Sequence, residues 1–583
     1  MPSLGEKPKT AIVVGAGAGG VALAARLAKA GFSVTVLEKN SFTGGRCSLM
    51  HHEGHRFDQG PSLFLLPQLF HETFRDLGTT LSDAGVDLLR CETNYNIWFH
   101  DGELFKHTSD LAAMKTQIER WEGKDGFERY LQWLKEAHVH YEVSVRDVLH
   151  KNFTKLIHLA RPSFVRHVVN LHPLESIWSR ASRYFWSERL RRVFTFAVMY
   201  MGMSPFDAPA TYSLLQYTEF AEGIWYPRGG FHSVVAALVR IGERLGVNYR
   251  LNTPVSRVLT DGQKATGVVL ESGESLTADV VVVNADLVYA YGNLLPQTPT
   301  ISNYSKSLQK REASCSSISF YWCLDRKVPE LSTHNIFLAE EYRESFDAIF
   351  KHHSLPDEPS FYVNVPSRVD PSAAPEGKDT VIVLVPVGHL SQSKNGGDDG
   401  GADGLPTEQK DWDAIVARAR AAILPIISAR TGCAPLQDMI THEIVNTPLT
   451  WEDKFNLDKG AILGLTHGFF NVLAFRPRTR AEGLDNAYFV GASTHPGTGV
   501  PIVMAGAKIT AEQILDDRGL EVPWARGFGG MLQPQKESPQ NGKLDKVRYG
   551  FHFGSEEVAV LLIVFFLSVS YLYLWPTVQS LVC

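Results

Sequence analysis

The sequence predicts an α/β protein with three parts: a discontinuous parallel-sheet domain, a mixed α+β domain and a C-terminal transmembrane helix. Three observations predict this organisation. A strand, a glycine-rich turn, a helix and a second strand follow one another over residues 9–39. A further strand, glycine-rich turn and apolar helix stand at 486–507. An apolar run without a charged residue occupies 558–575.

The first glycine turn is typical of a dinucleotide site. Gly15, Gly17 and Gly20 have the spacing G-x-G-x-x-G between an apolar strand and an apolar helix, and Glu38 ends the next strand. In a Rossmann-like unit such glycines let the backbone approach a pyrophosphate at a helix N-terminus, and the acid binds the ribose hydroxyls. The negative charge of Glu38 disfavours a 2′-phosphate, so NADP is not expected.

A second loop favours FAD over NAD. Gly44, Gly45 and Arg46 follow Glu38 closely. A nicotinamide dehydrogenase has no general need of such a loop, whereas a flavin enzyme must hold a longer, buried cofactor, and Arg46 is available to its phosphates. The alternative is a surface turn with a solvated arginine.

The late segment 486–507 repeats the pattern of the opening. It contains Gly491, and its turn ends in Thr498, Gly499 and Val500 at the start of an apolar helix. The backbone N–H groups of such a turn are suited to contact the flavin ring or its phosphates. A plain corner between a strand and a helix is the alternative.

Length and composition narrow the function class. The chain has 583 residues, too many for one core, and its 44% hydrophobic and 21% charged residues are ordinary for a globular protein. A net charge of −6 gives no sign of nucleic-acid binding. Six scattered cysteines without a C-x-x-C pair indicate neither a disulfide framework nor a zinc site, so no metal is expected.

The order of these patterns predicts a nucleotide-binding domain in three parts with insertions between them. The expected segments are 9–115 (first part of the FAD-binding domain), 116–235 (mostly helical insertion associated with substrate or membrane), 236–300 (second part), 301–450 (substrate domain with strands), 451–518 (third part), 519–555 (linker) and 556–576 (transmembrane helix).

Two segments predict contact with a membrane. The run 558–575 just suffices, at roughly 1.5 Å per residue, to cross a hydrocarbon layer of about 30 Å, and a buried helix is the alternative. Residues 176–192 mix arginines with aromatics, which suits either an anionic bilayer surface or a helix with its arginines in water. We expect a single-pass C-terminal anchor with the catalytic part on the cytoplasmic side, in the endoplasmic reticulum or another endomembrane.

Five motifs together resemble the phytoene desaturases of the bacterial and fungal type. They are the glycine turn, the 44–46 loop, 57–61 (FDQGP), 225–230 (WYPRGG) and 490–501 (VGASTHPGTGVP). The likeness runs from about residue 9 to 514, and the apolar tail is similar to that of fungal members. The resemblance implies a GR2-type, Rossmann-like FAD domain and an oxidoreductase acting on CH–CH groups. Its substrate would be phytoene, a C40 polyene of carotenoid biosynthesis, and its products lycopene or 3,4-didehydrolycopene.

The resemblance also implies a catalytic group. Hydride transfer to a flavin with loss of a proton from the neighbouring carbon needs a base but no metal. Family likeness points to Asp147, whose other interpretation is a helix carboxylate paired with Arg146 or with solvent. The family often has a basic residue where His150 stands, so the role of that position is open. The resemblance leaves open whether oxygen or a quinone accepts the electrons.

Two other functions fit the same glycine pattern. Amine oxidases and protoporphyrinogen oxidases share this architecture, but many amine oxidases tether flavin through a cysteine near the late glycine motif, and residues 491–507 contain none. A flavin-free, prenyl-binding escort protein of the Rab GDP-dissociation-inhibitor kind would not require both the Arg46 loop and the late turn. A visible absorption spectrum separates these alternatives.

Overall fold

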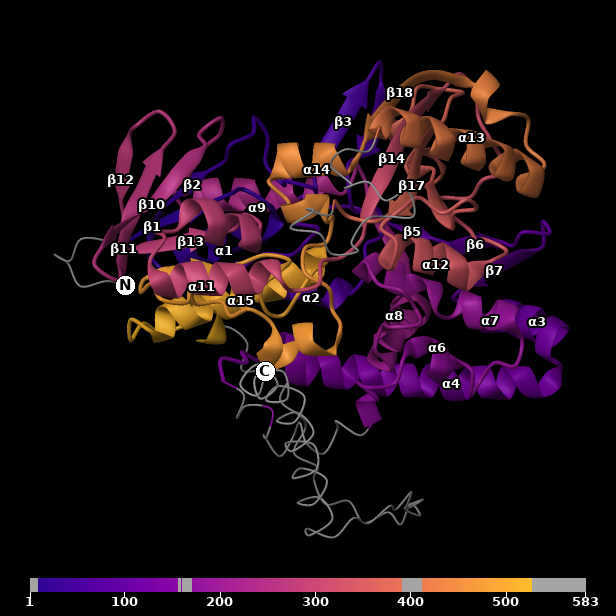
Figure 1. Cartoon of the computed structure of the whole chain (residues 1–583), viewed down its shortest axis with the longest axis horizontal. Helices are drawn as coiled ribbons and strands as arrows, with labels where there is room; N and C mark the ends of the chain where they lie inside the picture. The colour runs from indigo at the N-terminus through magenta and orange to yellow at the C-terminus, as the bar shows by residue number, and fades with distance from the viewer. Residues whose placement is uncertain (1–8, 156–158, 160–169, 391–410, 527–583) are drawn as a thin grey trace, which may run out of the picture. The chain divides into compact units, whose positions relative to one another are not determined.

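The structure is a computed structural model that describes residues 9–155, 159, 170–390 and 411–526. Within this part, a five-stranded and a seven-stranded sheet form the two main cores, and helices pack on both (Figure 1). Smaller sheets and short helices connect them.

The five-stranded sheet is parallel throughout and has the order β19-β13-β1-β2-β9. Strands β1 and β13 at its centre carry almost only valine, isoleucine and alanine, as expected for a parallel sheet covered on both faces. The strands are β1 (Thr10–Val14), β2 (Ser33–Leu37), β9 (Asn248–Arg250), β13 (Val280–Val283) and β19 (Ala487–Phe489). Strands from four distant parts of the chain thus build one sheet.

Alternate residues of these strands face two different layers. Ala11 and Val13 pack against helices, whereas Ile12 and Val14 pack against a small antiparallel sheet and two further helices. The first layer contains α1 (Ala18–Lys29), α2 (Pro67–Asp76), α9 (His232–Arg244) and α15 (Val500–Asp516). The second contains β10 (Val255–Asp261), β11 (Lys264–Leu270), β12 (Ser275–Thr277), α10 (Leu287–Tyr289) and α11 (Pro299–Gln309).

The seven-stranded sheet has the order β18-β14-β17-β16-β15-β6-β7 and is antiparallel except where β6 pairs with β15. One face packs on α13 (Trp412–Thr431), and the other packs on the helical insertion. The strands are β6 (Thr93–Trp98), β7 (Leu104–Thr108), β14 (Ser316–Leu324), β15 (His334–Phe337), β16 (Phe361–Asn364), β17 (Thr380–Val387) and β18 (Ile440–Asn446).

The position of β6 and β7 differs from the sequence expectation. Both lie within 9–115, which was expected to form the first part of the nucleotide-binding domain. Instead β6 pairs in parallel with β15, with Ile97 opposite Ile336, so both strands extend the seven-stranded sheet. Local periodicity predicts that a strand exists but not which distant strand it joins, because the pairing is decided by burial of both faces.

The helical insertion is held by an amphipathic helix. On α4 (Lys124–Ser144), Tyr130, Trp133, Ala137 and Tyr141 recur at helical spacing and are buried. The other described elements are α3 (Leu111–Glu122), α6 (Ile177–Ala181), α7 (Glu188–Val193), the 3₁₀ helix η3 (Phe196–Met201), α8 (Leu214–Tyr217) and two π turns, η1 (Val145–Leu149) and η5 (Thr218–Glu222).

Most arginines of 176–192 form ion pairs with carboxylates of the same chain. Phe185 is fully buried, whereas Trp186 is 67% exposed. Four arginines form ion pairs with carboxylates of the chain: Arg180 with Glu136, Arg183 with Glu175, Arg189 with Asp101 and Arg192 with Glu188. The geometry therefore favours a structural helix pair over a free basic surface in this segment.

Further elements are the hairpin of β3 (Leu49–His52) and β4 (His55–Asp58), the pair β5 (Leu88–Cys91) and β8 (Ile224–Pro227), the helices α12 (Tyr342–Phe350) and α14 (Pro448–Phe455), and several short 3₁₀ and π helices.

Of the two segments expected at a membrane, residues 176–192 are described and residues 558–575 lie outside the described chain. Among the described residues, no helix combines the length and the hydropathy needed to traverse a bilayer. The expected transmembrane helix at 556–576 lies outside the described residues, as does the expected linker from residue 527 on.

Candidate flavin site and active site

The two glycine turns of the sequence lie at the same edge of the five-stranded sheet. Strand β13 pairs with β1 on one side and with β19 on the other, so the turns leave neighbouring carboxyl ends. Asn284 directly follows β13 and lies between them. In the side-chain orientation that satisfies the amide, its oxygen accepts hydrogen bonds from the Gly17 and Gly20 N–H groups at 3.2 Å. Its nitrogen donates to the Val490 carbonyl at 3.0 Å. One side chain thus bridges both turns.

The first turn has no room for side chains. A Cβ added at Gly20 would lie 2.2 Å from the Gly15 carbonyl oxygen, and one at Gly17 would lie 2.7 Å from the Asn284 amide. Gly15 itself has a φ of 99°, which other residues rarely adopt. The bare backbone of this turn therefore fits close approach of a phosphate group.

Both helices that start at these turns lack a side-chain cap. Gly17 is the N-cap of α1 and Gly499 that of α15, whose first residue is Val500. The unpaired N–H groups of an uncapped first turn carry partial positive charge and bind anions or ring oxygens. Three N–H groups at these turns already have partners: those of Gly17 and Gly20 donate to Asn284, and that of Thr498 donates to His467 Nε2 at 3.0 Å.

Glu38 lies beside the first turn. One carboxylate oxygen accepts from the Ala16 N–H at 2.7 Å, and the other accepts from the Asn40 N–H at 2.9 Å. The residue is only 6% exposed. The second oxygen also accepts from Asn40 Nδ2 at 2.9 Å, whereas the oxygen that faces Ala16 keeps a further lone pair and can also receive a ribose hydroxyl.

The 44–46 loop packs directly on the first turn. The Gly44 N–H donates to the Ala16 carbonyl at 2.8 Å, and the Cβ position of Gly45 lies 3.6 Å from the Gly17 Cα. Arg46 donates to the Ile462 carbonyl, its single hydrogen-bond partner within the described chain. Burial lowers the pKa of Arg46, although the Asp286 carboxylate opposes this. Most donors of this guanidinium remain available to phosphate.

These observations fit FAD. The structure brings together two uncapped helix N-termini, a carboxylate suited to ribose and an arginine suited to phosphate. The sequence-predicted residues found at this edge are Gly15, Gly17, Gly20, Glu38, Gly44, Gly45, Arg46, Gly491, Thr498, Gly499 and Val500.

Two buried residues that sequence reasoning missed shape the late turn. Arg476 is 1% exposed, and its hydrogen-bond acceptors among the described residues are all carbonyl oxygens, including those of Ala492, of Thr494 at 3.0 Å and of Asn471 at 2.7 Å. Burial lowers its pKa to about 9. His467 holds the Thr498 N–H as described. Neither residue belongs to a glycine motif, so no local signal marks it.

Asp147 lies on the π turn η1 and is 2% exposed. Its Oδ1 accepts from Lys151 Nζ at 2.6 Å and its Oδ2 from Arg146 Nη2 at 2.8 Å. Burial by itself would raise the pKa of Asp147, but the hydrogen bonds from Arg146 and Lys151 hold it below its ordinary value. The carboxylate is therefore ionised at neutral pH.

The segment after Asp147 is tied to the flavin edge. The Lys151 carbonyl accepts a hydrogen bond from His495 Nε2 at 2.8 Å, within the late glycine segment. His150 Nε2 lies 2.7 Å from Glu72 on α2, and Glu72 also pairs with Lys508 on α15. These contacts position η1 against the two helices that border the late turn.

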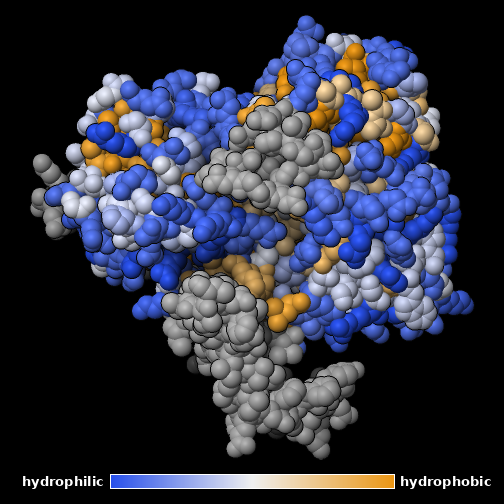
Figure 2. All heavy atoms as spheres, in the orientation of Figure 1, coloured by the Kyte–Doolittle hydropathy of each residue, from blue (hydrophilic) through white to orange (hydrophobic). Residues whose placement is uncertain are grey.

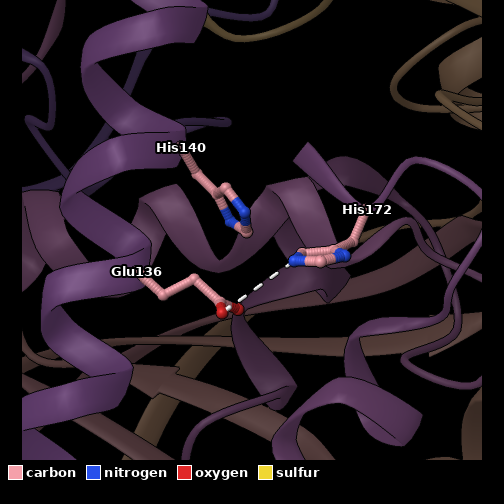
Figure 3. Close-up of side chains that lie close together, drawn as sticks. All are labelled: Glu136, His140 and His172. Atoms are coloured by element: carbon pink, nitrogen blue, oxygen red, sulfur yellow. Dashed lines mark ion pairs between the residues drawn. The ribbon is translucent and has the colours of Figure 1, made fainter. Parts of the chain in front are cut away.

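A cluster of Glu136, His140 and His172 has the composition of a metal site (Figure 3). Its ligand atoms already have protein partners. Arg180 and Tyr184 donate to the Glu136 carboxylate. The two ring nitrogens of His140 contact Ser213 Oγ and the Asn170 carbonyl, each at 2.7 Å. A cation would have to displace a guanidinium, so we interpret this cluster as structural.

Comparison with known proteins identifies the family. The family model described as flavin containing amine oxidoreductase matches residues 18–394. The phytoene desaturase of Neurospora crassa is 66% identical over 89% of this chain and 87% of its own length, and that of Fusarium fujikuroi is 61% identical over 92% and 94%. The chain belongs to the phytoene desaturase family.

Membership of the phytoene desaturase family confirms the resemblance, the oxidoreductase class and the expectation of FAD. It leaves the flavin-free escort protein without support. A solved oxidoreductase from Methanosarcina mazei, 17% identical, aligns over 86% of this chain and 100% of its own with a TM-score of 0.58. That likeness shows the fold alone, and it agrees with the expected α/β architecture.

Proposed function

We propose that this chain catalyses successive FAD-dependent dehydrogenations of phytoene to lycopene and further to 3,4-didehydrolycopene. The observation that carries the proposal is 66% identity to a phytoene desaturase over nearly the whole chain. The two glycine turns bridged by Asn284 support it, because they form the cofactor edge that such an enzyme needs.

Residues of this chain would bind the cofactor and would accept the proton that leaves the substrate. FAD supplies the hydride acceptor when it is bound. The first turn and Glu38 would bind its adenosine side, Arg46 its phosphates, and the N–H groups at Gly499 and Val500 its ring. These contacts would orient the cofactor.

We assign the proton-accepting role to Asp147. Its carboxylate is ionised, buried and linked through Lys151 to the late glycine segment. In an Asp147→Asn variant we expect FAD content to stay normal while anaerobic flavin reduction by phytoene slows at least a hundredfold, in line with general-base contributions. Normal reduction kinetics in this variant would move the role to another group.

The decisive experiment uses the purified FAD-loaded chain with phytoene in liposomes. We expect polyenes with longer conjugation, identified by chromatography and their visible spectra. A bound and reducible flavin beside unchanged phytoene would overturn the proposal. An amine-driven reduction of the same flavin would instead favour an amine oxidase.

A membrane anchor completes the proposal. The uncharged run at 558–575 and a substrate that dissolves in lipid support a single-pass C-terminal helix, with the catalytic part on the cytoplasmic side of the endoplasmic reticulum or another endomembrane. Removing residues 528–583 should release the enzyme from the membrane pellet with its FAD retained. A truncated chain that still sediments with membranes would contradict the anchor.

In this proposal, oxygen or a quinone accepts the electrons that the enzyme takes from its substrate. Oxygen consumption coupled to desaturation, compared with anaerobic turnover on an added quinone, separates the two acceptors.

A further inference from the structure

A histidine of the late glycine segment is linked to the proposed base. His495 is 2% exposed, and its Nε2 donates a hydrogen bond to the Lys151 carbonyl at 2.8 Å. The ammonium group of the same Lys151 donates to Asp147 Oδ1 at 2.6 Å. The main chain and the side chain of one lysine therefore connect the late turn to the Asp147 carboxylate.

The imidazole of His495 carries its hydrogen on Nε2. A carbonyl oxygen only accepts, so the contact with Lys151 requires an N–H at that nitrogen. Burial lowers the pKa of His495 to about 4, although the hydrogen bond to the Lys151 carbonyl opposes this, and the ring is neutral at pH 7. Nδ1 has no hydrogen-bond partner among the described residues. The nitrogen that does donate therefore binds the segment that follows the base.

The His495 ring has little freedom to move. The Phe153 ring packs edge-on against it with a centroid distance of 5.4 Å, and the His495 main-chain N–H donates to the Pro477 carbonyl at 3.0 Å. A Cβ at Gly506 on α15 would lie 3.0 Å from Pro496 Cδ, so the residue after His495 is in close contact with this helix. These contacts hold the Nε2 donor at a fixed place beside α15.

The turn that carries Asp147 is held against the same helix. The π turn η1 directly continues α4 and contacts α15 (Figure 1). Arg146 Nη2 binds the second carboxylate oxygen, Oδ2, at 2.8 Å. Lys151 differs from Arg146 in that its main chain also binds the late segment. A shift of His495 would therefore reach the carboxylate through Lys151.

Dehydrogenation requires a fixed spacing between two acceptors. When CH–CH becomes C=C, one carbon loses a hydride to the cofactor and its neighbour loses a proton to the carboxylate. The electron pair that the proton leaves behind forms the new π bond. Because the two carbons are bonded to each other, a misplacement of either acceptor by about 1 Å costs about a hundredfold in rate. Hydrophobic residues lie at the surface near the junction of η1 and α15, beside atoms drawn in grey (Figure 2), which suits an apolar substrate.

We propose that His495 is a positioning residue that sets the spacing between the late turn and the Asp147 carboxylate through its hydrogen bond to the Lys151 carbonyl. This inference rests on the proposed desaturase function with Asp147 as the base. It gives a side chain of the late glycine segment a part in proton removal, whereas the glycines of that segment serve cofactor binding.

The test compares four FAD-loaded enzymes: wild type, His495→Asn, Asp147→Asn and the double variant. The rate of anaerobic flavin reduction by phytoene in liposomes is measured per bound flavin. The shorter Asn side chain does not reach the Lys151 carbonyl, so reduction at saturating phytoene should slow about tenfold, with an unchanged half-saturating concentration. In the Asp147→Asn background the same substitution should slow reduction by less than about twofold, because no base remains to be positioned. Equal slowing in both backgrounds would overturn the proposal.

Three further variants isolate the hydrogen bond. His495→Gln places an amide nitrogen near the position of Nε2 and should restore the rate to within about threefold of the wild type, so equal rates in the Asn and Gln variants would refute the role. His55→Asn changes a histidine that is also 2% exposed but bonds Thr380 instead, and it should keep the wild-type rate. A tenfold slowing there would refute the role as well, because it would show a general effect of losing a buried imidazole. If His495→Asn fails to fold, Lys151→Met replaces it, because this variant removes the ammonium group from Asp147, and an unchanged rate would contradict the proposal.

The inference and the proposed function fail separately. Absence of flavin reduction by phytoene in the wild type would refute the desaturase function. If phytoene reduces the wild-type flavin but the effects of the His495 and Asp147 substitutions simply multiply, the positioning role of His495 alone is refuted.

Discussion

At the scale of single residues, the cofactor edge depends on polar side chains that bind main-chain atoms. Asn284 forms hydrogen bonds with both glycine turns, and Arg476 donates hydrogen bonds to carbonyl oxygens of the late segment. Because their partners are backbone groups, these contacts fix the course of the chain rather than the identity of neighbouring side chains. Changes at these positions should therefore act on cofactor binding before they act on chemistry.

Gly20→Ala tests the packing of the first turn. The added carbon would meet the Gly15 carbonyl oxygen at 2.2 Å, so the turn has to open. We expect loss of most bound FAD and destabilisation by on the order of 1–3 kcal/mol, measured by flavin absorbance per chain and by denaturant unfolding. Gly292→Ala is the matched control because no atom of the described residues lies within 4 Å of its Cβ position. Equal FAD content in both variants would contradict the account.

Glu219 makes stability depend on pH. Its pKa is about 8 in the folded chain because of burial, and near 4.5 when unfolded. Between these values only the unfolded state loses the proton, so rising pH favours unfolding, by at most about 1.4 kcal/mol per pH unit. Glu219→Gln removes this effect. The difference in unfolding free energy, variant minus wild type, should grow from pH 5 to pH 8, and a flat difference would show that Glu219 is ionised in the folded state.

At the scale of elements, helix starts and strand ends converge on one edge. Helices α1 and α15 begin there without side-chain caps, and η1 is attached nearby through His495 and Glu72. An uncapped helix start is unfavourable in isolation because its N–H groups lack partners. A bound anionic cofactor supplies those partners, so helix ends and cofactor stabilise one another.

Arg476→Lys tests how the late element is held. The planar guanidinium spreads its donors over several carbonyl groups, whereas a lysine ammonium is a compact charge that reaches fewer of them. We expect weaker FAD binding by tenfold or more and a lower melting temperature, with secondary structure retained by circular dichroism. Arg478→Lys, which changes an exposed arginine two positions away, should leave both properties unchanged. Similar losses in both variants would point to a general effect of the substitution.

The sequence predicts the local elements of the cofactor edge, but not the distant side chains that contact them. The G-x-G-x-x-G turn, Glu38 and the late turn are local patterns whose chemistry follows from spacing. Asn284, His467, Arg476 and Glu219 are not, because each acquires its role from residues far along the chain. The same reason applies to β6, whose partner β15 is more than two hundred residues away. Periodicity reports which face is apolar, and long-range pairing is decided only by the packed whole.

At the scale of the whole molecule, four distant stretches of chain form the cofactor sheet. The four stretches are residues 10–37 with β1 and β2, 248–250 with β9, 280–283 with β13 and 487–489 with β19. A ligand that touches both glycine turns at the carboxyl edge of this sheet binds only the folded chain. Its binding free energy is therefore added to the stability of the fold.

Removal of FAD should measurably destabilise the protein. At a free concentration of about 100 times the dissociation constant, FAD should stabilise the folded state by about 2.7 kcal/mol. The expected result is a higher melting temperature when FAD is restored to stripped enzyme. Riboflavin lacks the pyrophosphate and adenosine and should give a smaller rise. An equal rise with riboflavin would show that the first turn and Glu38 contribute nothing to binding.

The late place of β19 in the chain has a consequence for biosynthesis. A ribosome completes the turn at Gly15 early, but β19 and the start of α15 emerge only after residue 487 has been added. A nascent or prematurely terminated chain that stops before this point lacks the late glycine turn, so we expect it to bind no FAD. Flavin absorbance of the purified chain therefore reports that its translation has passed Val500.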